Sequence, residues 1–379
     1  MMTIREYEKI FASDCPQFDE LSKFSEAGDF LSLGWQRGRG AYVQAKNYVG
    51  VIQFPSGFQI EILPKLDAPI EKLRGLVTKM ICTLKDFRFK EFRAADLDTA
   101  RLDLYDIFIN IYLKMVSDLV KRGLKASYVT REENLNIFKG KLLVNENIRR
   151  NVAHKEKFFV AYDEYSINRP ENRLIKAALC KLRSKKSARR LLESFDTVAT
   201  STNYAKDFAA VSIDRTNREY QAVMAWTHKI LAGKSFTPFA GNSKAMALLF
   251  PMERLFEAYI AEHAKKVFSD RYTVRTQVRE NFLFDEPRSY GLKPDIILDG
   301  DERIIMDTKW ELKPTSADMY QMFAYARRYD AKKIILICPA NGEGNEIYRA
   351  EDFEVTIWRV DLFAVNKFGS ALAKPYANR

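Results

Sequence analysis

The segment PDIILDGDERIIMDTKW, residues 294–310, is the feature that most constrains the fold of this chain. Two short runs of apolar, β-branched residues, which are typical of buried strands, are separated by turn-forming residues at 300–302. The same segment contains Asp295, Asp307 and Lys309, and burying charged groups without a partner is costly. We therefore predict a buried β-hairpin whose charges have a specific purpose.

A hairpin in which residue 299 pairs with residue 303 sets Asp295 directly opposite Asp307. Directly opposed side chains have Cβ atoms about 4.5–5.5 Å apart, and the period of two along a strand keeps Lys309 on the same face. Two carboxylates this close repel each other unless a cation lies between them. Mg²⁺, with Mn²⁺ as a substitute, is the expected cation because it prefers oxygen ligands and is often shared with substrate phosphate.

The chemistry expected of this cluster is hydrolysis of a phosphate ester. A bound Mg²⁺ activates water and offsets charge on the leaving oxygen. Lys309 would position the attacking water or stabilise the charge of the pentacovalent state. The alternative is a structural hairpin with a buried Asp–Lys pair and an unrelated surface aspartate.

Two helical segments on either side of the hairpin supply further candidate residues. The helix around PMERLFEAYIAEHAKKV brings Glu257 to the border of its apolar face as a third metal ligand, with Glu253 as the competing choice. Gln321 and Tyr325 are four residues apart, so they share one helix face beside the same site. An exposed helix glutamate and simple amphipathic packing are the alternative explanations.

Hydrophobic periodicity predicts an α/β chain with a β-rich start, a helical middle and a C-terminal mixed sheet flanked by helices. Strands are expected within 40–64, around a turn at 55–57, and in five short runs after residue 272. A further helix is expected in SADMYQMFAYARRYD, between the third and fourth of those runs. Residues 127–160 are expected to be mixed. The other expected helices cover 69–87, 102–122, 163–186, 216–232 and 244–268.

Composition narrows the class of protein. The net charge of +11 favours a polyanionic partner, although the basic run RSKKSARR at 183–190 is more simply a solvated helix face. The four cysteines lie far apart without a CxxC pair, which favours reduced thiols over a disulfide framework or zinc site. We find neither an apolar run long enough to span a bilayer nor a signal-peptide pattern, so we expect a cytoplasmic protein with no membrane partner.

The ordered series Glu257, PD at 294–295, DTK at 307–309 and QxxxY at 321–325 resembles the PD-(D/E)-x-K nuclease superfamily, in particular its RecB-type branch. The whole chain is similar to the McrC family of nuclease subunits. That likeness rests on VGVIQFPSGFQIEILPKL, NLNIFKGKL, NRLIKAAL, LFEAY, LKPDIIL, IMDTKW and YQMFAYARRY.

The resemblance implies a Mg²⁺-dependent DNA endonuclease whose partner, a GTP-hydrolysing AAA+ ring, recognises modified DNA and translocates. This chain has no G-x-x-x-x-G-K-[ST] loop of its own. In that family the subunit docks onto the ring through its N-terminal region and stimulates GTP hydrolysis. By match to the motifs, Asp295, Asp307 and Glu257 are the metal ligands, Lys309 is the catalytic lysine, and Gln321 and Tyr325 are supporting, DNA-proximal residues.

The expected domains follow from the same resemblance. Residues 1–165 form the partner-docking region, and residues 166–379 form the nuclease domain, with a helical lead-in and a catalytic core at about 243–379. Arg169 and Arg173 are candidate partner contacts, although a helix N-terminus explains them more simply. A stand-alone RecB-like repair nuclease and a non-cutting DNA-binding or regulatory subunit remain the competing functions.

Overall fold

The chain folds into two compact units in a computed structural model. Residues Met1–Phe108 and Gly233–Arg379 form the first unit, and residues Ile109–Ala232 form the second. This division does not follow the expected boundary between 1–165 and 166–379, because a strand from the second half of the chain completes the N-terminal sheet. The structure describes residues 1–26, 29–84, 102–232, 246–340 and 344–363.

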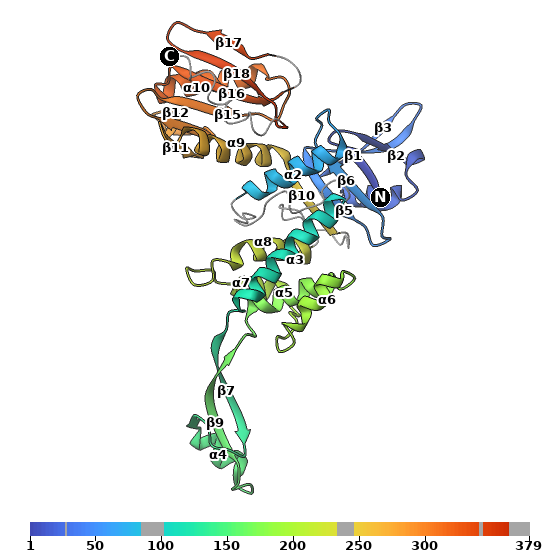
Figure 1. The fold of residues 1–379 in the computed structure, drawn as a ribbon, viewed down its shortest axis with the longest axis vertical. Helices are drawn as coiled ribbons and strands as arrows, with labels where there is room; N and C mark the ends of the chain where they lie inside the picture. The colour runs from blue at the N-terminus through green and yellow to red at the C-terminus, as the bar shows by residue number, and fades with distance from the viewer. Residues whose placement is uncertain (27–28, 85–101, 233–245, 341–343, 364–379) are drawn as a thin grey trace. The chain divides into compact units, whose positions relative to one another are not determined.

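Two small sheets build the N-terminal part of the first unit (Figure 1). The four-stranded sheet has the order β1-β6-β5-β10, and the three-stranded sheet has the order β2-β4-β3. The turn at 55–57 joins β5 to β6, as the sequence predicts. The elements are β1 (Met2–Arg5), β2 (Lys9–Phe11), η1 (Ala12–Asp14), α1 (Phe18–Glu26), β3 (Leu31–Gln36), β4 (Gly40–Ala45), β5 (Tyr48–Gln53), β6 (Gln59–Leu63), α2 (Ile70–Thr83) and β10 (Met246–Pro251).

Strand β10 corrects the helix predicted over 244–268. Residues 246–251 pair antiparallel with β5, and the helix α9 begins only at Met252. A short apolar run such as MALLFP has no periodicity that distinguishes a buried strand from a buried helix. Residues 246–251 form a strand because they pair with the open edge of β5. Gly50 permits this pairing, because a Cβ there would lie 2.0 Å from the Leu248 carbonyl oxygen.

A buried carboxylate, Glu61, ties three parts of the first unit together. Its side chain is 0% exposed and accepts two hydrogen bonds of 2.8 Å from the Arg74 guanidinium on α2. The Thr3 hydroxyl on β1 and the Leu104 backbone N–H at the start of α3 (Leu104–Arg122) donate to the same group, at 3.0 and 2.9 Å. Glu61 and Arg74 therefore form a structural ion pair, and the remaining hydrogen-bond capacity of the carboxylate is filled by Thr3 and Leu104.

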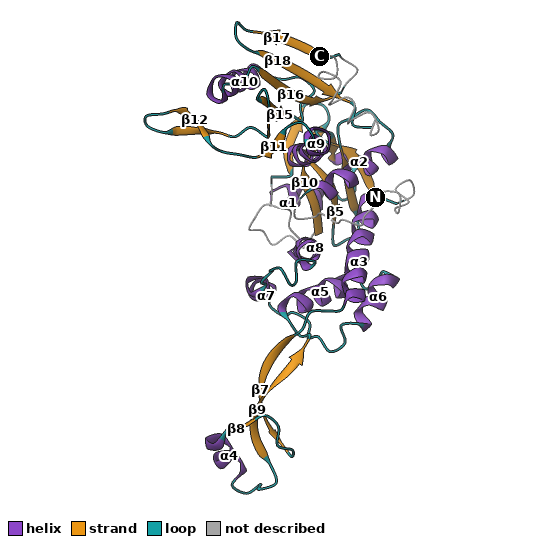
Figure 2. Ribbon diagram, turned by 60° about the vertical axis from the view of Figure 1, so that its left-hand side comes forward, coloured by secondary structure: helices purple, strands orange, loops and turns teal. Residues whose placement is uncertain are grey.

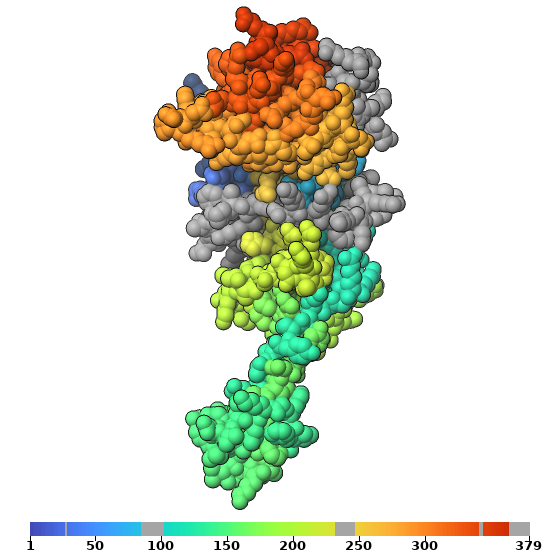
Figure 3. Space-filling view, turned by 90° about the vertical axis from the view of Figure 1, so that its left-hand side faces the viewer, coloured from blue at the N-terminus to red at the C-terminus, as the bar shows by residue number. Residues whose placement is uncertain are grey.

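The second unit contains a helical cluster and a long hairpin arm, which we define as residues 127–166 (Figure 3). The prediction for 127–160 misses this arm, in which β7 and β9 pair over nine residues. The helix predicted over 163–186 starts only at Pro170, because 163–166 continue β9. The elements are β7 (Ser127–Leu135), β8 (Lys141–Leu142), α4 (Val144–Asn151), β9 (Phe158–Ser166), α5 (Pro170–Lys181), α6 (Lys186–Glu193), α7 (Tyr204–Ala210) and α8 (Tyr220–Ala232).

The C-terminal part of the first unit is a six-stranded mixed sheet in the order β11-β14-β15-β16-β18-β17, with helices α9 and α10 packed against it (Figures 1 and 2). The predicted mixed sheet is confirmed, and β16 is buried along nearly its whole length. Strands β12, β13 and β17 were not predicted. The elements are α9 (Met252–Phe268), β11 (Thr273–Thr276), β12 (Asn281–Phe284), β13 (Ser289–Leu292), β14 (Ile296–Asp299), β15 (Ile304–Thr308), α10 (Ser316–Tyr329), β16 (Lys333–Pro339), β17 (Glu346–Arg349) and β18 (Glu354–Val360).

Candidate active site

The hairpin of β14 and β15 has the predicted register. Ile296 pairs with Met306 and Leu298 with Ile304, so the same antiparallel register, extended by one residue, sets Asp295 opposite Asp307. The four apolar residues predicted to pack behind the charges are all 0% exposed: Ile296, Leu298, Ile304 and Met306. The charges therefore lie on one face of a strand pair whose other face is core.

Asp295 is held at the start of β14 by donors from both sides. Its Oδ2 accepts hydrogen bonds from the backbone N–H and the hydroxyl of Thr308, at 2.8 and 2.6 Å. Its Oδ1 accepts one from the Gln277 amide at 3.0 Å. The carboxylate is therefore fixed in orientation by β15 and by the loop after β11.

Gln277 also brings Glu257 to the site. The same amide nitrogen donates to the Glu257 carboxylate on α9, so a single side chain bridges the two acids. The competing candidate, Glu253, instead accepts a hydrogen bond of 2.7 Å from Asn47. Gln277 was not predicted as a site residue, and its left-handed backbone (φ 57°) has no signature in the sequence.

Lys309 follows β15 and contacts three polar side chains. Its Nζ lies 3.1 Å from Asp307 Oδ2 and 3.5 Å from Asp318 Oδ1. It donates a hydrogen bond of 3.0 Å to the Gln321 amide oxygen, and the Gln321 amide nitrogen donates at 2.8 Å to the Tyr325 hydroxyl. The structure thus brings Gln321 and Tyr325 to the predicted lysine.

Asp318 is a second residue that sequence reasoning missed. Its carboxylate completes a capping box at the start of α10, accepting from the Thr315 backbone N–H and hydroxyl at 2.8 and 2.7 Å. The pattern of a threonine followed three residues later by an acid is a readable helix-start signal. It could have placed an additional carboxylate at the first turn of the helix that follows Lys309.

Burial and neighbouring charges shift the pKa values of the ionisable groups at the site. Burial raises the pKa of Glu257 to about 7, and the charges of Asp295 and Asp307 add to the rise. Burial, followed by the charge of Asp295, also raises the pKa of Asp307. Burial opposes the charge of Lys309, but Asp307 beside it raises the pKa of the ammonium overall. Lys309 is therefore a cation at neutral pH and suits charge stabilisation better than proton abstraction.

The donor chemistry of the site fits a hard divalent cation. Asp307 Oδ2 is buried and lies 3.1 Å from the Lys309 ammonium, which can occupy only one of the lone pairs of this oxygen. Oxygen donors of this kind are those that Mg²⁺ prefers. Within the described ranges, no three His, Cys, Asp or Glu side chains already form a ligand group. The Gln277 amide lies between Glu257 and Asp295 instead.

The end of β15 is tied to the N-terminal sheet. The Trp310 indole, 1% exposed, donates from Nε1 to both oxygens of Glu6, at 3.0 and 3.2 Å. The Lys65 backbone N–H donates to the same carboxyl at 3.1 Å. Burial raises the pKa of Glu6 to about 7. Trp310, immediately after Lys309, is thus anchored by a side chain 304 residues away in sequence.

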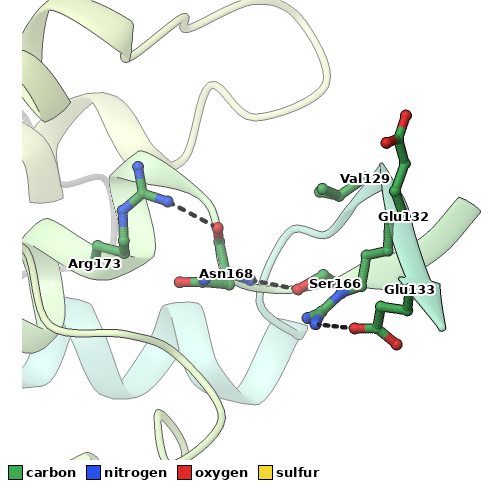
Figure 4. Close-up of a pocket in the computed structure, with 7 residues that line it drawn as sticks. Val129, Glu132, Glu133, Ser166, Asn168 and Arg173 are labelled. Carbon is green, nitrogen blue, oxygen red and sulfur yellow. Dashed lines mark hydrogen bonds and ion pairs between the residues drawn. The ribbon is translucent and has the colours of Figure 1, made fainter. Parts of the chain in front are cut away.

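A separate cavity of about 360 Å³ lies at the root of the arm in the second unit (Figure 4). Arg173 lines it and donates to the Asn168 carbonyl at 3.1 Å, while its guanidinium pairs with Asp207 at 2.6 Å. Arg169 pairs with Glu171 at 3.0 Å. Both arginines at the start of α5 therefore have acidic partners within the chain, which favours the structural explanation for them.

Comparisons with known proteins give the family and the fold of the chain. A family model described as "McrBC 5-methylcytosine restriction system component" matches residues 43–339. The chain is also similar to a solved chain from the refined half-complex of a tetradecameric assembly of Thermococcus gammatolerans McrB AAA+ hexamers with bound McrC. That match has a TM-score of 0.75 and 17% identity, and it covers 99% of both chains.

A second solved chain, from the cryo-EM structure of the Thermococcus gammatolerans McrBC complex, matches with a TM-score of 0.51 and 19% identity. It covers 68% of this chain and 85% of the other. At these identities the likeness shows a shared fold. The curated proteins contain no match to this chain. No helix in the part of the chain that the structure describes is long and apolar enough to cross a membrane.

Proposed function

Because the chain belongs to the McrBC 5-methylcytosine restriction system family, whose model spans residues 43–339, we propose that it is the DNA-cutting subunit of such a system. It hydrolyses DNA phosphodiesters and works with an AAA+ partner that recognises modified DNA and hydrolyses GTP. The observation that carries the proposal is the convergence of Asp295, Asp307 and Lys309 on one face of a buried hairpin. A PD-(D/E)-x-K nuclease core needs this constellation.

The chain's own residues have distinct tasks in this reaction. Asp295, Asp307 and Glu257 are the acids that would hold Mg²⁺, or Mn²⁺ in its place, and Thr308 and Gln277 orient Asp295. When bound, the metal supplies an activated water and neutralises charge on the phosphate oxygens.

Lys309 remains protonated beside Asp307 and stabilises the charge that develops on the attacked phosphate. Gln321 accepts a hydrogen bond from this ammonium and donates one to Tyr325, so both residues of the QxxxY pair hold the lysine in place. A lysine fixed in this way needs no reorganisation when the charge appears.

The arm is the part of the chain that we assign to the AAA+ partner. In the arm, β8 adds only a two-residue strand to the pairing of β7 with β9, and one short helix packs against β9, so the arm buries little core of its own. It exposes eight large apolar side chains. Such a concentration marks a protein interface. In the similar solved assembly, McrC is bound to McrB AAA+ hexamers. We infer that the arm docks onto the ring and stimulates GTP hydrolysis. The exposed residues are Tyr128, Val129, Ile137, Phe138, Val144, Ile148, Val152 and Tyr165.

A plasmid-cutting assay tests this function. Methylated and unmethylated plasmids are incubated with the purified chain and Mg²⁺, with and without the AAA+ partner and GTP. The proposal predicts cutting of the methylated plasmid only when the partner and GTP are both present. Cutting by the chain alone, regardless of methylation, would indicate a stand-alone nuclease instead. Absence of cutting under every condition would indicate a binding or regulatory subunit.

The assignment of the arm has its own control. Phe138→Ser and Ile148→Ser replace two of its exposed apolar residues and are expected to abolish stimulation of GTP hydrolysis. Ile347→Ser, at an equally exposed position on β17 (52% exposed), is the matched control and is expected to leave stimulation intact. Equal stimulation by all three variants would contradict the assignment.

A further inference from the structure

The hairpin of β12 and β13 begins and ends at the candidate active site. Its two strands pair only with each other, apart from the six-stranded sheet, and stand out beside α10 (Figure 2). At its root the Gln277 backbone N–H donates to the Asp295 carbonyl at 3.1 Å, and the Gln277 side chain bonds the Asp295 carboxylate. A shift of this hairpin would therefore move the Asp295 carboxylate through its hydrogen bonds with Gln277.

The outer part of the hairpin exposes a pair of aromatic rings. Tyr290 is 75% exposed and Phe284 is 52% exposed, and their ring centroids lie 5.9 Å apart in an edge-to-face arrangement. Tyr290 has a left-handed backbone (φ 57°), a conformation that costs free energy for a residue with a large side chain. Strain of this kind concentrates at ligand-contacting positions. Nothing within the described fold buries these rings.

Three cationic side chains lie along the same hairpin, and acids act on them only at longer range. The charge of Arg288 helps to lower the pKa of Asp285, and the charge of Lys293 opposes the rise in the pKa of Glu257. No described carboxylate comes within ion-pair distance of Arg279, Arg288 or Lys293. The Arg288 guanidinium lies 4.4 Å from the centroid of the Phe282 ring. The Arg279 side chain crosses Gly291 so closely that a Cβ there would lie 2.3 Å from Nε. Arg279 and Arg288 are thus held against the ribbon, where Arg288 also donates to the Glu280 carbonyl at 3.4 Å, and neither forms an ion pair that would compete with an external anion.

The acids of the hairpin are, by contrast, largely neutralised. Glu280 pairs with Arg275 at 2.7 Å, and Asp285 pairs with Arg328 at 2.5 Å. Glu286, in the turn of the hairpin, is the acid that no described cation pairs with. Exposed cations beside exposed aromatic rings, with Glu280 and Asp285 paired, are complementary to nucleic acid, which offers phosphates and flat bases.

The dimensions also fit a DNA duplex. A two-stranded ribbon fits the major groove, which is about 12 Å wide. Tyr290 is five residues from Asp295, which corresponds to at most roughly 17 Å of extended chain at about 3.3 Å per residue. That length spans about five base pairs at about 3.4 Å each.

We propose that the β12–β13 hairpin is a DNA-binding ribbon that enters the groove next to the cut. Phe284 and Tyr290 contact sugars and bases, while Arg279 and Arg288 contact phosphates. The ribbon holds the duplex so that a phosphodiester lies against Asp295. This inference rests on the proposed function, since it takes the substrate to be duplex DNA.

The test measures DNA affinity and cutting separately. The affinity of the full-length chain for a fluorescent DNA duplex is measured at several salt concentrations. Cutting rates are measured separately, with the AAA+ partner present. Tyr290→Gly removes the ring at a position where glycine adopts the left-handed backbone readily, so a loss of binding does not come from new backbone strain. We expect roughly tenfold weaker binding from the loss of one stacking aromatic. Arg279→Gln and Arg288→Gln are each expected to lower the salt-dependence slope by about 0.9.

Tyr348→Ala is the matched control, because Tyr348 is a half-exposed aromatic on β17, at the opposite edge of the sheet from β11. Unchanged affinity and unchanged salt slope in the hairpin variants, relative to this control, would overturn the ribbon. If the wild-type complex cuts nothing but the hairpin variants lose DNA affinity, the ribbon stands and the proposed function fails. If the wild type cuts and all variants bind and cut alike, the ribbon alone fails.

Discussion

The substitution Glu6→Gln tests how the N-terminal sheet supports the strand that ends at Trp310. Burial raises the pKa of Glu6 from 4.5 to about 7, so the folded chain retains a proton that the unfolded chain releases. The stability that this proton contributes is fully present below about pH 4.5 and is lost as the pH rises through about 7. A shift of this size corresponds to about 3 kcal/mol. The glutamine keeps an oxygen for the Trp310 and Lys65 donors but does not ionise.

The assay is urea unfolding of the full chain, followed by tryptophan fluorescence, at a series of pH values from 4.5 to 8.5. We expect the variant and the wild type to have similar free energies of unfolding at the acid end. The variant should become more stable by up to about 3 kcal/mol above pH 7.5. Glu351→Gln makes the same chemical change at an exposed position and should give a flat difference. A flat difference for Glu6→Gln as well, or one that favours the wild type at high pH, would refute the reasoning.

Three further substitutions follow from the contacts described above. Arg74→Leu leaves Glu61 buried without its cation, so we expect the free energy of unfolding to fall by about 3–5 kcal/mol. Urea denaturation measures this loss, and a loss below about 1 kcal/mol would contradict the buried ion pair. Gln277→Leu removes a hydrogen bond from each of two site carboxylates. We expect it to slow single-turnover cutting about 10–100-fold while GTP hydrolysis stays intact. An unchanged cutting rate would show that Gln277 does not support the site. Tyr325→Phe deletes only the hydroxyl that accepts from Gln321, so we expect about a fivefold lower cutting rate with unchanged DNA affinity, and a larger drop in affinity than in rate would assign the hydroxyl to DNA contact.

The hairpin at the site was predictable because its information is local. The turn at 300–302 fixes the register, and the period of two then places Asp295, Asp307 and Lys309 on one face. The same holds for Gln321 and Tyr325, since one helical turn is enough to align them. Each of these inferences needs only residues that are near one another in sequence.

The features that were missed depend on contacts that are distant in sequence. Residues 246–251 form a strand because β5 offers an open edge some 200 residues earlier, which no local pattern reveals. Gln277 reaches the site through a left-handed backbone conformation that sequence patterns assign to glycine or asparagine. The arm was missed because β7 and β9 pair across an interruption that contains β8 and α4, so their alternation resembles separate short elements.

The pKa shifts at the site could not be predicted from the sequence either. The spacing of Asp295 and Asp307 predicts repulsion, but burial, which the sequence does not give, is the largest cause that raises the pKa of Glu257 to about 7, and the charges of the two aspartates add to it. The same burial leaves Asp307 Oδ2 shielded from solvent beside the Lys309 ammonium. A chain folded for stability alone would gain by replacing these acids, so their presence is best explained by function.

The cutting rate of Asp307→Asn tests the central claim most directly. The variant changes one oxygen for a nitrogen in a buried side chain, so it preserves shape while removing the charge that the site requires. Single-turnover cutting of methylated plasmid is measured with the AAA+ partner, GTP and Mg²⁺, and GTP hydrolysis is followed in the same reactions. We predict that cutting falls by at least about 10³-fold, as expected when a site loses its main electrostatic stabilisation, while GTP hydrolysis continues at the wild-type rate. Cutting that survives in this variant would contradict the assignment of the active site.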